Sequence, residues 1–252
     1  MGKAIRDGLG EAHEILVHDI ELGTTISDIT DNTDFAYIAV PTPTDEETLE
    51  CDTSIVESVL SELPKGFTVV IKSTVIPGTT DRLQNEFKEL RIACSPEFLR
   101  TETATEDFRS QDILVVGSHH EDIPITVHRQ HLESGILRGG DFFHVTPTQA
   151  EIVKYAKNSF YAMKVIFGNQ FQQLSEHLGE DWGGIKRIIT HPQKQGIVDS
   201  HLDVIPGQFG FGGHCLPKDT VAVLTELKKI GLDYRILSAV IDDNARLRGE
   251  TQ

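Results

Sequence analysis

A cysteine in a glycine-rich turn is the strongest candidate for chemistry in this sequence. Residues 210–219 read GFGGHCLPKD, so Cys215 follows three glycines and precedes Lys218 and Asp219. The residues that follow, TVAVLTELKKI, have helical spacing, which would place the thiol at a helix N-terminus. The positive end of the helix dipole, with Lys218 nearby, favours a reactive thiolate. Cys215 is therefore a candidate nucleophile, although an inert cysteine buried in a turn has the same spacing.

Three other polar residues could orient or deprotonate a substrate. Lys154 and Asn158 lie four residues apart in a helical pattern, so they share one face and could hold one substrate oxygen. On spacing alone, a solvated Lys–Asn pair is the commoner outcome. Glu97, in CSPEFLR (94–100), follows an apolar run and could act as a general base, or could simply be a solvated loop residue.

Two loops of similar character follow apolar runs. AVPTPT (39–44) and KSTVIPGTT (72–80) both combine prolines with hydroxyl side chains at the end of a predicted strand. Ordinary turn chemistry explains such residues individually. Because the pattern occurs twice at strand ends, we interpret both loops as ligand contacts.

The elements that must position these residues are those of an α/β protein. Strands are predicted at 13–20, 35–41, 67–74, 91–95 and 112–118, and helices at 52–63 and 78–90. Strands that alternate with helices indicate a mostly parallel sheet, which binds ligands at the carboxyl ends of its strands.

The pattern changes after Pro147. Residues 148–179 form one helical pattern without proline, about 45 Å long if continuous, and further helices are predicted at 183–191, 217–230 and 233–248. We therefore predict two domains, 1–145 and 146–252, the second all-helical around a long central helix. A helix of that length suggests an element that joins domains or subunits, and we expect a homodimer through 148–178.

Composition excludes several classes of protein. The net charge of −16 argues against binding to nucleic acid, which needs clustered lysine and arginine. The three cysteines lack a CxxC pair, so neither a disulfide framework nor a thiolate metal site is expected. With no apolar run long enough to span a membrane and no signal peptide, we expect a cytoplasmic protein.

Taken together, these motifs resemble the UDP-glucose/GDP-mannose dehydrogenase family. The resemblance runs in order through FAYIAVPTPT, IKSTVIPGTT, CSPEFLR, AEIVKYAKNSFYAMKVIFGNQF, GFGGHCLPKDT and ILSAVIDDNARLR, and covers nearly the whole chain. It implies a Rossmann-like NAD-binding domain followed by the helical domain. It also implies oxidation of a nucleotide-sugar primary alcohol to a carboxylate with two NAD molecules.

The resemblance implies a role for each candidate. Cys215 would attack the intermediate aldehyde and carry a thiohemiacetal and then a thioester. Lys154 would stabilise the oxyanion, Asn158 and a water held by Asp219 would assist proton transfer, and Glu97 would support thioester hydrolysis. The implied substrate contacts are Lys218, Phe98, Leu99, Arg100 and Gly212. The implied NAD contacts are Gly2, Asp19, Val40, Pro41, Thr42, Ser73 and Thr74.

The sequence departs from the family pattern in three places. The first strand and most of its Gly-x-Gly-x-x-Gly turn are missing, with Gly2 aligned to the last glycine, which leaves the Rossmann sheet incomplete. The C-terminal domain that binds the nucleotide sugar is also missing, and Thr101-Glu102 replaces the usual Glu-Gly after PEFLR. For the missing first strand we prefer a truncated sequence to a working protein that fills the gap otherwise, and a second polypeptide could supply the missing C-terminal part of the substrate site.

Three functions stay open. UDP-glucose oxidation is preferred, because GFGGHCLPKD resembles that branch, with GDP-mannose and UDP-N-acetylhexosamine as other substrates. A non-catalytic relative that acts as a dimerisation module would explain the missing segments. A β-hydroxyacid dehydrogenase would share the NAD domain and the Lys–Asn helix, but would not need Cys215.

Overall fold

The computed structural model describes residues 1–191, 209–229, 231 and 235–249. The chain divides into two compact units, one of Met1–Asp45 with Cys51–Lys154, the other of Glu46–Glu50 with Tyr155–Gln252. The division falls inside the long helix α7 (Pro147–Leu178), whereas the sequence suggests a boundary near residue 145. Each unit is described by itself.

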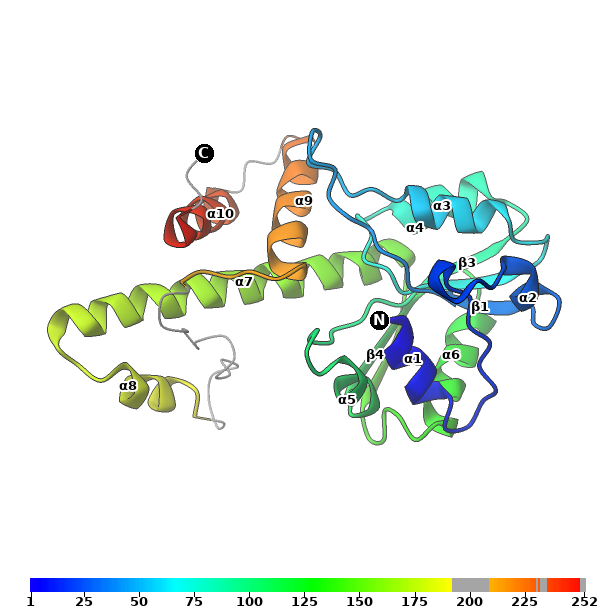
Figure 1. The fold of residues 1–252 in the computed structure, drawn as a ribbon, viewed down its shortest axis with the longest axis horizontal. Coiled ribbons are helices and arrows are strands. Elements are labelled where there is room, and N and C mark those ends of the chain that lie inside the picture. The colour runs from blue at the N-terminus through cyan, green and yellow to red at the C-terminus, as the bar shows by residue number, and fades with distance from the viewer. Residues whose placement is uncertain (192–208, 230, 232–234, 250–252) are drawn as a thin grey trace. The chain divides into compact units, whose positions relative to one another are not determined.

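The first unit is built on a five-stranded sheet (Figure 1). Its strands lie in the order of the chain: β1 (Phe35–Ile38), β2 (Thr68–Ile71), β3 (Arg91–Cys94), β4 (Ile113–Gly117) and β5 (Asp141–Val145). Neighbouring strands are parallel, except for β3 and β4, which meet antiparallel at Cys94 and Gly117. The predicted mostly parallel sheet is confirmed, and the last residues of β3 and β4 lie side by side.

Helices cover both faces of this sheet. The first unit contains α1 (Gly2–Leu9), α2 (Ile26–Thr30), α3 (Ser54–Ser61), α4 (Thr79–Glu86), α5 (Ala104–Arg109) and α6 (Asp122–Glu133). In β2, Val69 and Ile71 pack with α3 and α4, while Val70 packs with α1, α5 and α6 on the other face (Figure 1). This alternation buries all four residues of β2, as a strand inside a two-sided parallel sheet requires.

The strand predicted at 13–20 is wrong. Residues 14–19 form no regular element, and Asp19 caps a short 3₁₀ turn at Ile20–Leu22 by accepting a hydrogen bond from the backbone N–H of Glu21. A strand needs a neighbour for its backbone groups, and among the described strands β1 pairs only with β2. Leu16 and Ile20 are 42% and 90% exposed, so the apolar pattern overstated the burial of this segment.

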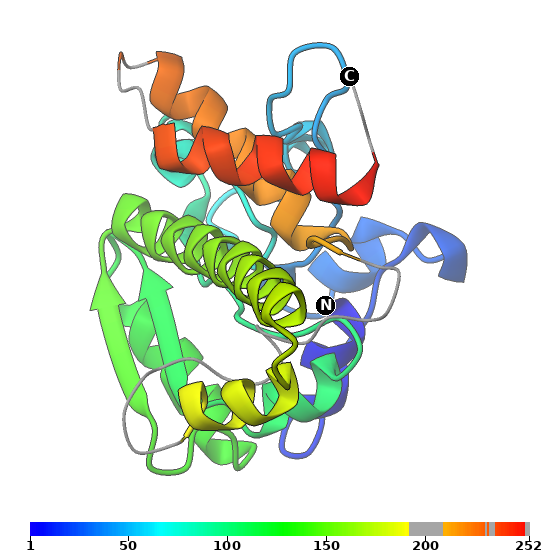
Figure 2. The same ribbon diagram turned by 90° about the vertical axis from the view of Figure 1, so that its left-hand side faces the viewer.

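The second unit is helical. Besides the later turns of α7 it contains α8 (Trp182–Ile189), α9 (Cys215–Lys229) and α10 (Arg235–Arg248). Ala162 and Ile166 of α7 pack with Phe211 and with Val240 of α10, and Figure 2 shows α9 and α10 next to each other. The predicted helices 148–179, 183–191, 217–230 and 233–248 are confirmed where they overlap these elements; residues 230, 233 and 234 lie outside the described residues. None of the helices in the described ranges has the length and apolar content that a membrane span requires.

Gly117 is placed where the sheet meets α7, and we expect its replacement by alanine to be costly. A Cβ at this position would lie 2.7 Å from the Cα of Pro147 and 2.9 Å from the carbonyl oxygen of Thr146, neither of which can rotate away. Gly117→Ala should lower the free energy of unfolding by about 1–3 kcal/mol, measured by urea unfolding followed by circular dichroism. Gly2→Ala is the matched control, because its Cβ would meet nothing within 4 Å. Equal unfolding midpoints for the two variants would contradict the close contact.

Candidate functional site

Two loops at the carboxyl ends of β1 and β2 are tied together. The Thr42 hydroxyl donates to the carbonyl oxygen of Thr74 at 2.7 Å, and the Ser73 hydroxyl donates to the carbonyl oxygen of Val40 at 2.7 Å. Thr42 and Ser73 are buried, whereas Pro41 is exposed. The structure therefore brings Val40, Thr42, Ser73 and Thr74 together, as expected for residues that share one ligand site.

A carboxylate from α7 occupies the N-terminus of α4, the helix that follows the second loop. Glu151 accepts hydrogen bonds from the backbone N–H of Gly78 at 2.6 Å and from the N–H and hydroxyl of Thr80 at 2.8 and 2.6 Å. Burial raises the pKa of Glu151, and the bonds from Thr80 and Gly78 oppose that rise. Because these donors are engaged, the N-terminus of α4 positions the loop and offers no open anion site.

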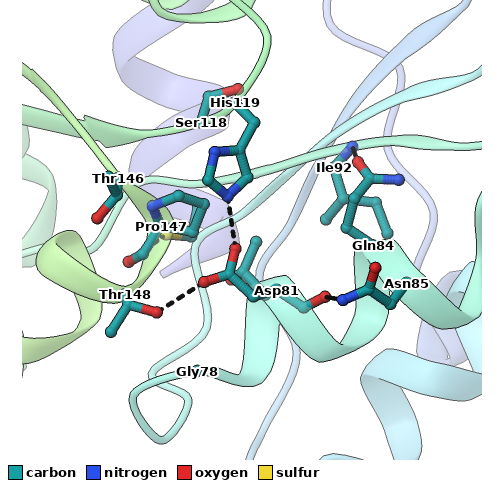
Figure 3. A network of polar contacts seen from close by, with 12 residues as sticks. Gly78, Asp81, Gln84, Asn85, Ile92, Ser118, His119, Thr146, Pro147 and Thr148 are labelled. Carbon is teal, nitrogen blue, oxygen red and sulfur yellow. Dashed lines mark hydrogen bonds and ion pairs between the residues drawn. The ribbon is translucent and has the colours of Figure 1, made fainter.

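A second network fastens the start of α7 to the same helix (Figure 3). The Asp81 carboxylate accepts from the Thr148 hydroxyl at 2.7 Å and lies 2.8 Å from Nε2 of His119. His119 thus contacts α4. The side-chain amide of Asn85 donates to the backbone carbonyl of Asp81 at 2.9 Å and extends the network along the helix. Together with Glu151, Asp81 fixes the first turns of α7 relative to the loops that follow β2 and β4.

Lys154 projects from this anchored part of α7. Its ammonium donates to the backbone carbonyl of Glu97 at 2.7 Å and lies 6.0 Å from the centre of the Phe98 ring. A small pocket of about 10 Å³, close to the space that one water needs, is lined by Ile71, Ser73, Thr74, Val75, Cys94, Pro96, Glu151 and Lys154. Within the first unit, a predicted catalytic lysine and two predicted cofactor residues therefore share one pocket.

The Glu97 carboxylate points into the protein interior. Its side chain is 3% exposed and forms an ion pair with Lys72, whose side chain is fully buried and also donates to the Ser95 hydroxyl at 3.0 Å. Lys72 is not among the predicted site residues, although a lysine directly after the apolar run FTVVI is a signal for a buried partner of opposite charge. A carboxylate held in this way orients its own loop, and its Oε1 contacts the Lys72 ammonium.

Two of the predicted substrate residues have partners within their own unit. Arg100 is bound by Asp107 of α5, through a 2.7 Å contact from Nη2 and a 2.9 Å contact from its backbone N–H. The Arg100 guanidinium lowers the pKa of Asp107 to about 2. Leu99 packs against the core beneath α1 and α5. A substrate contact from Arg100 would have to share its guanidinium with Asp107.

In the second unit, Cys215 is the first residue of α9 and is exposed. Two buried asparagines hold the turn before it: Asn169 of α7 accepts from the N–H of Gly210 at 2.9 Å, and Asn244 of α10 accepts from the N–H of Phe211 at 2.6 Å. Gly210 has φ of +81°, and its Cβ would lie 2.5 Å from the Asn244 side chain. Side chains from two helices, α7 and α10, therefore fix the backbone of the turn that precedes the thiol. The spacing of the sequence does not predict these contacts.

The predicted glycine contact is not explained by packing. A Cβ on Gly212 would lie 2.8 Å from the Arg248 guanidinium, but that group is the far end of a flexible side chain and can move aside. A role of Gly212 in binding a substrate stays a prediction.

Asp219 lies one turn into α9 and is 1% exposed. Asn158 of α7 donates a side-chain hydrogen bond to one carboxylate oxygen, and the Lys218 ammonium lies 2.8 Å from the other. Lys218 therefore pairs with Asp219. Three predicted residues come together here, and a buried carboxylate fixed by one amide donor and one ion pair can hold a water or a hydroxyl in a fixed orientation.

Only some of the residues that are predicted to bind a dinucleotide lie together in the structure. Thr42, Ser73 and Thr74 form a polar edge of the sheet, whereas Asp19 is exposed and caps the 3₁₀ turn at Ile20–Leu22. Gly2 begins α1, and a Cβ there would meet nothing within 4 Å, so its surroundings are open. Among the described residues, no group of histidine, cysteine, aspartate or glutamate is arranged to hold a metal ion.

Comparison with known proteins gives matches over both units. Residues 7–131 match the model of the UDP-glucose/GDP-mannose dehydrogenase family, NAD binding domain, and residues 148–246 match the central domain of the same family. A UDP-glucose 6-dehydrogenase from Rickettsia conorii is 32% identical over 220 residues, which cover 84% of this chain and 49% of that protein. UDP-glucose 6-dehydrogenase AglM from Haloferax volcanii is 31% identical over 256 residues, which cover 94% of this chain and 58% of that protein.

A solved structure gives the same result. A UDP-glucose dehydrogenase from Pyrobaculum islandicum superposes with a TM-score of 0.76 and 27% identity over 97% of this chain and 61% of that chain. The chain thus spans about half the length of the curated relatives that it matches, and the match confirms the Rossmann-like architecture.

Proposed function

Because the chain belongs to the UDP-glucose/GDP-mannose dehydrogenase family and contains its NAD binding domain, we propose that it oxidises the primary alcohol of a nucleotide sugar to a carboxylate. UDP-glucose is the preferred substrate, since the R. conorii and H. volcanii relatives are UDP-glucose 6-dehydrogenases. The activity and the substrate are proposals because the chain spans 49% of the first of these proteins.

One observation carries the proposal. An exposed thiol stands at the first residue of α9, and one helical turn later a buried carboxylate is held by Asn158 and Lys218. A cysteine that serves only to pack the core would be buried. Burying a carboxylate costs free energy, which favours a functional role for Asp219. Two asparagines that hold the preceding turn add a fixed backbone beneath the thiol.

In the proposed reaction, the first oxidation removes two electrons from the alcohol and yields an aldehyde. The Cys215 thiolate then adds to the aldehyde carbon, and Lys154 stabilises the charge on the oxygen. A second two-electron oxidation converts this thiohemiacetal to a thioester. Water, activated with the help of Asp219 and Asn158, breaks the carbon–sulfur bond, releasing the carboxylate and restoring the thiol. NAD, when bound, accepts a hydride from the sugar carbon in each of the two oxidations.

The binding residues complete the proposal. Thr42, Ser73 and Thr74, with Val40 and Pro41, would contact NAD, and Phe98 and Lys218 would contact the sugar nucleotide. Glu97 would support thioester hydrolysis. The homodimer through 148–178 and the cytoplasmic location stay predictions.

The test is an assay of the purified chain with NAD and UDP-glucose. NADH is followed by absorbance and the uronic acid by chromatography, with NAD binding measured separately by calorimetry. We expect two NADH for each acid formed, since the oxidation removes four electrons. GDP-mannose and UDP-N-acetylglucosamine, run in parallel, decide between the branches of the family. A folded chain that produces neither NADH nor acid from any of the three would overturn the proposal in favour of a non-catalytic relative.

A further inference from the structure

Lys72 occupies an unusual position for a charged residue. It directly follows β2, and its side chain is 0% exposed. Its ammonium donates to the Ser95 hydroxyl at 3.0 Å and forms an ion pair with the Glu97 carboxylate. Both of these partners follow β3, so the register between β2 and β3, with Ile71 opposite Cys94, brings them together.

Neither charge of this pair can remain alone in the interior. Glu97 has a side chain that is 3% exposed, and removing either partner would leave the other charge without compensation. The nearest alternative for an unpaired Glu97 carboxylate is water, which it can reach only if the loop that carries it moves. Lys72 therefore determines where the Glu97 loop lies.

The position of that loop sets the position of a second lysine. The backbone carbonyl of Glu97 accepts the hydrogen bond from the Lys154 ammonium at 2.7 Å, so Glu97 is held at its carboxylate by Lys72 and binds Lys154 at its carbonyl. We propose that Lys72 is a positioning residue that fixes the Lys154 ammonium through Glu97. The consequence for catalysis rests on the proposed function of Lys154, but the positioning itself does not.

The experiment measures the chemical accessibility of Lys154. The purified chain is trace-labelled with acetic anhydride, and acetylation of each lysine is quantified by mass spectrometry relative to Lys65, whose side chain is 81% exposed. Lys154 is 8% exposed and should label slowly in the unaltered protein. In Lys72→Met, the uncompensated carboxylate should displace the loop and raise the labelling of Lys154 several-fold.

Two further variants separate positioning from general destabilisation. In Lys72→Met/Glu97→Gln neither charge of this pair is left, so the labelling of Lys154 should return towards that of the unaltered chain. Val127→Ala, a buried change in α6, should lower stability without raising Lys154 labelling. The proposal is overturned if Lys72→Met raises the labelling no more than Val127→Ala does, or if the double variant stays as reactive as Lys72→Met.

The labelling needs neither NAD nor a sugar nucleotide. A chain that fails to form acid can therefore still pass this test, and a chain that forms acid can fail it. The failure of the positioning role and the failure of the proposed function are thus recognised separately.

Discussion

Cys215→Ala should abolish acid formation by the chain while leaving NAD binding intact. Without the thiol no carbon–sulfur bond forms, so the second oxidation loses its covalent intermediate. The rate of acid formation should fall by at least about 10³-fold, as is usual when a catalytic nucleophile is removed. The measurement is the uronic acid released from UDP-glucose, with calorimetry on the same sample to show that NAD still binds.

The matched control for this variant is His214→Ala. His214 is the exposed neighbour of Cys215 in the same turn, so its removal disturbs the same backbone without touching the thiol. We expect acid formation by His214→Ala to remain near that of the unaltered chain. If Cys215→Ala still formed acid at a comparable rate, the thiol would not be the nucleophile, and a dehydrogenase chemistry that does not use the cysteine would be favoured.

The parts of the fold that could be predicted are those in which burial and local spacing agree. The run FTVVI becomes β2 because both faces of that strand are covered, and the helical spacing after Cys215 becomes α9. The family resemblance is also confirmed, because its motifs lie in contiguous stretches that a single sequence displays. In these segments the local sequence is sufficient to predict the secondary structure.

Elements in which burial and local spacing do not agree cannot be predicted in this way. The sequence pattern predicts none of α1, α5, α6 and β5. In α6, which reads DIPITVHRQHLE, several β-branched residues and a proline lower the helical propensity. The helix is instead stabilised by tertiary packing, because Ile123, Val127 and His131 recur every four residues and are all buried. A histidine at a core position conceals this stripe from a hydrophobicity pattern.

For the site, the sequence predicts which residues take part and does not predict the contacts between them. Lys72 and Glu97 are 25 residues apart, and only the pairing of β2 with β3 brings them together. Likewise, the asparagines that hold the Cys215 turn come from α7 and α10, far from the turn in sequence. Partners of this kind depend on register and helix packing, which local spacing does not encode.

The buried histidine of α6 leads to the second large prediction, an acid-dependent loss of stability. His131 is 0% exposed, and its Nδ1–H donates to the carbonyl oxygen of Val127 at 2.7 Å, while Nε2 has no partner among the described residues. Burial, followed by the positive charge of Lys72, lowers the pKa of His131 to about 3. The folded protein therefore keeps this ring neutral at mildly acidic pH.

The direction of the effect follows from proton uptake on unfolding. An unfolded histidine titrates near its ordinary pKa of 6.5, so between pH 6.5 and about 3 the unfolded chain binds a proton that the folded chain excludes. Stability is complete above this window and falls as the pH falls through it, by about 1.4 kcal/mol for each pH unit. By pH 4 the loss should reach about 3 kcal/mol, a large fraction of the stability of a typical domain.

His131→Leu should remove this dependence, because leucine fills the buried position without titrating. Urea unfolding at several pH values between about 7 and about 4 should show the stability of the unaltered chain falling steadily, while the variant stays nearly level until carboxylates begin to protonate. His191→Gln, a change at an exposed histidine, should keep the slope of the unaltered chain. If His131→Leu keeps that slope as well, the proton taken up on unfolding belongs to another group, and the neutral His131 in the core is not what sets the acid limit of this fold.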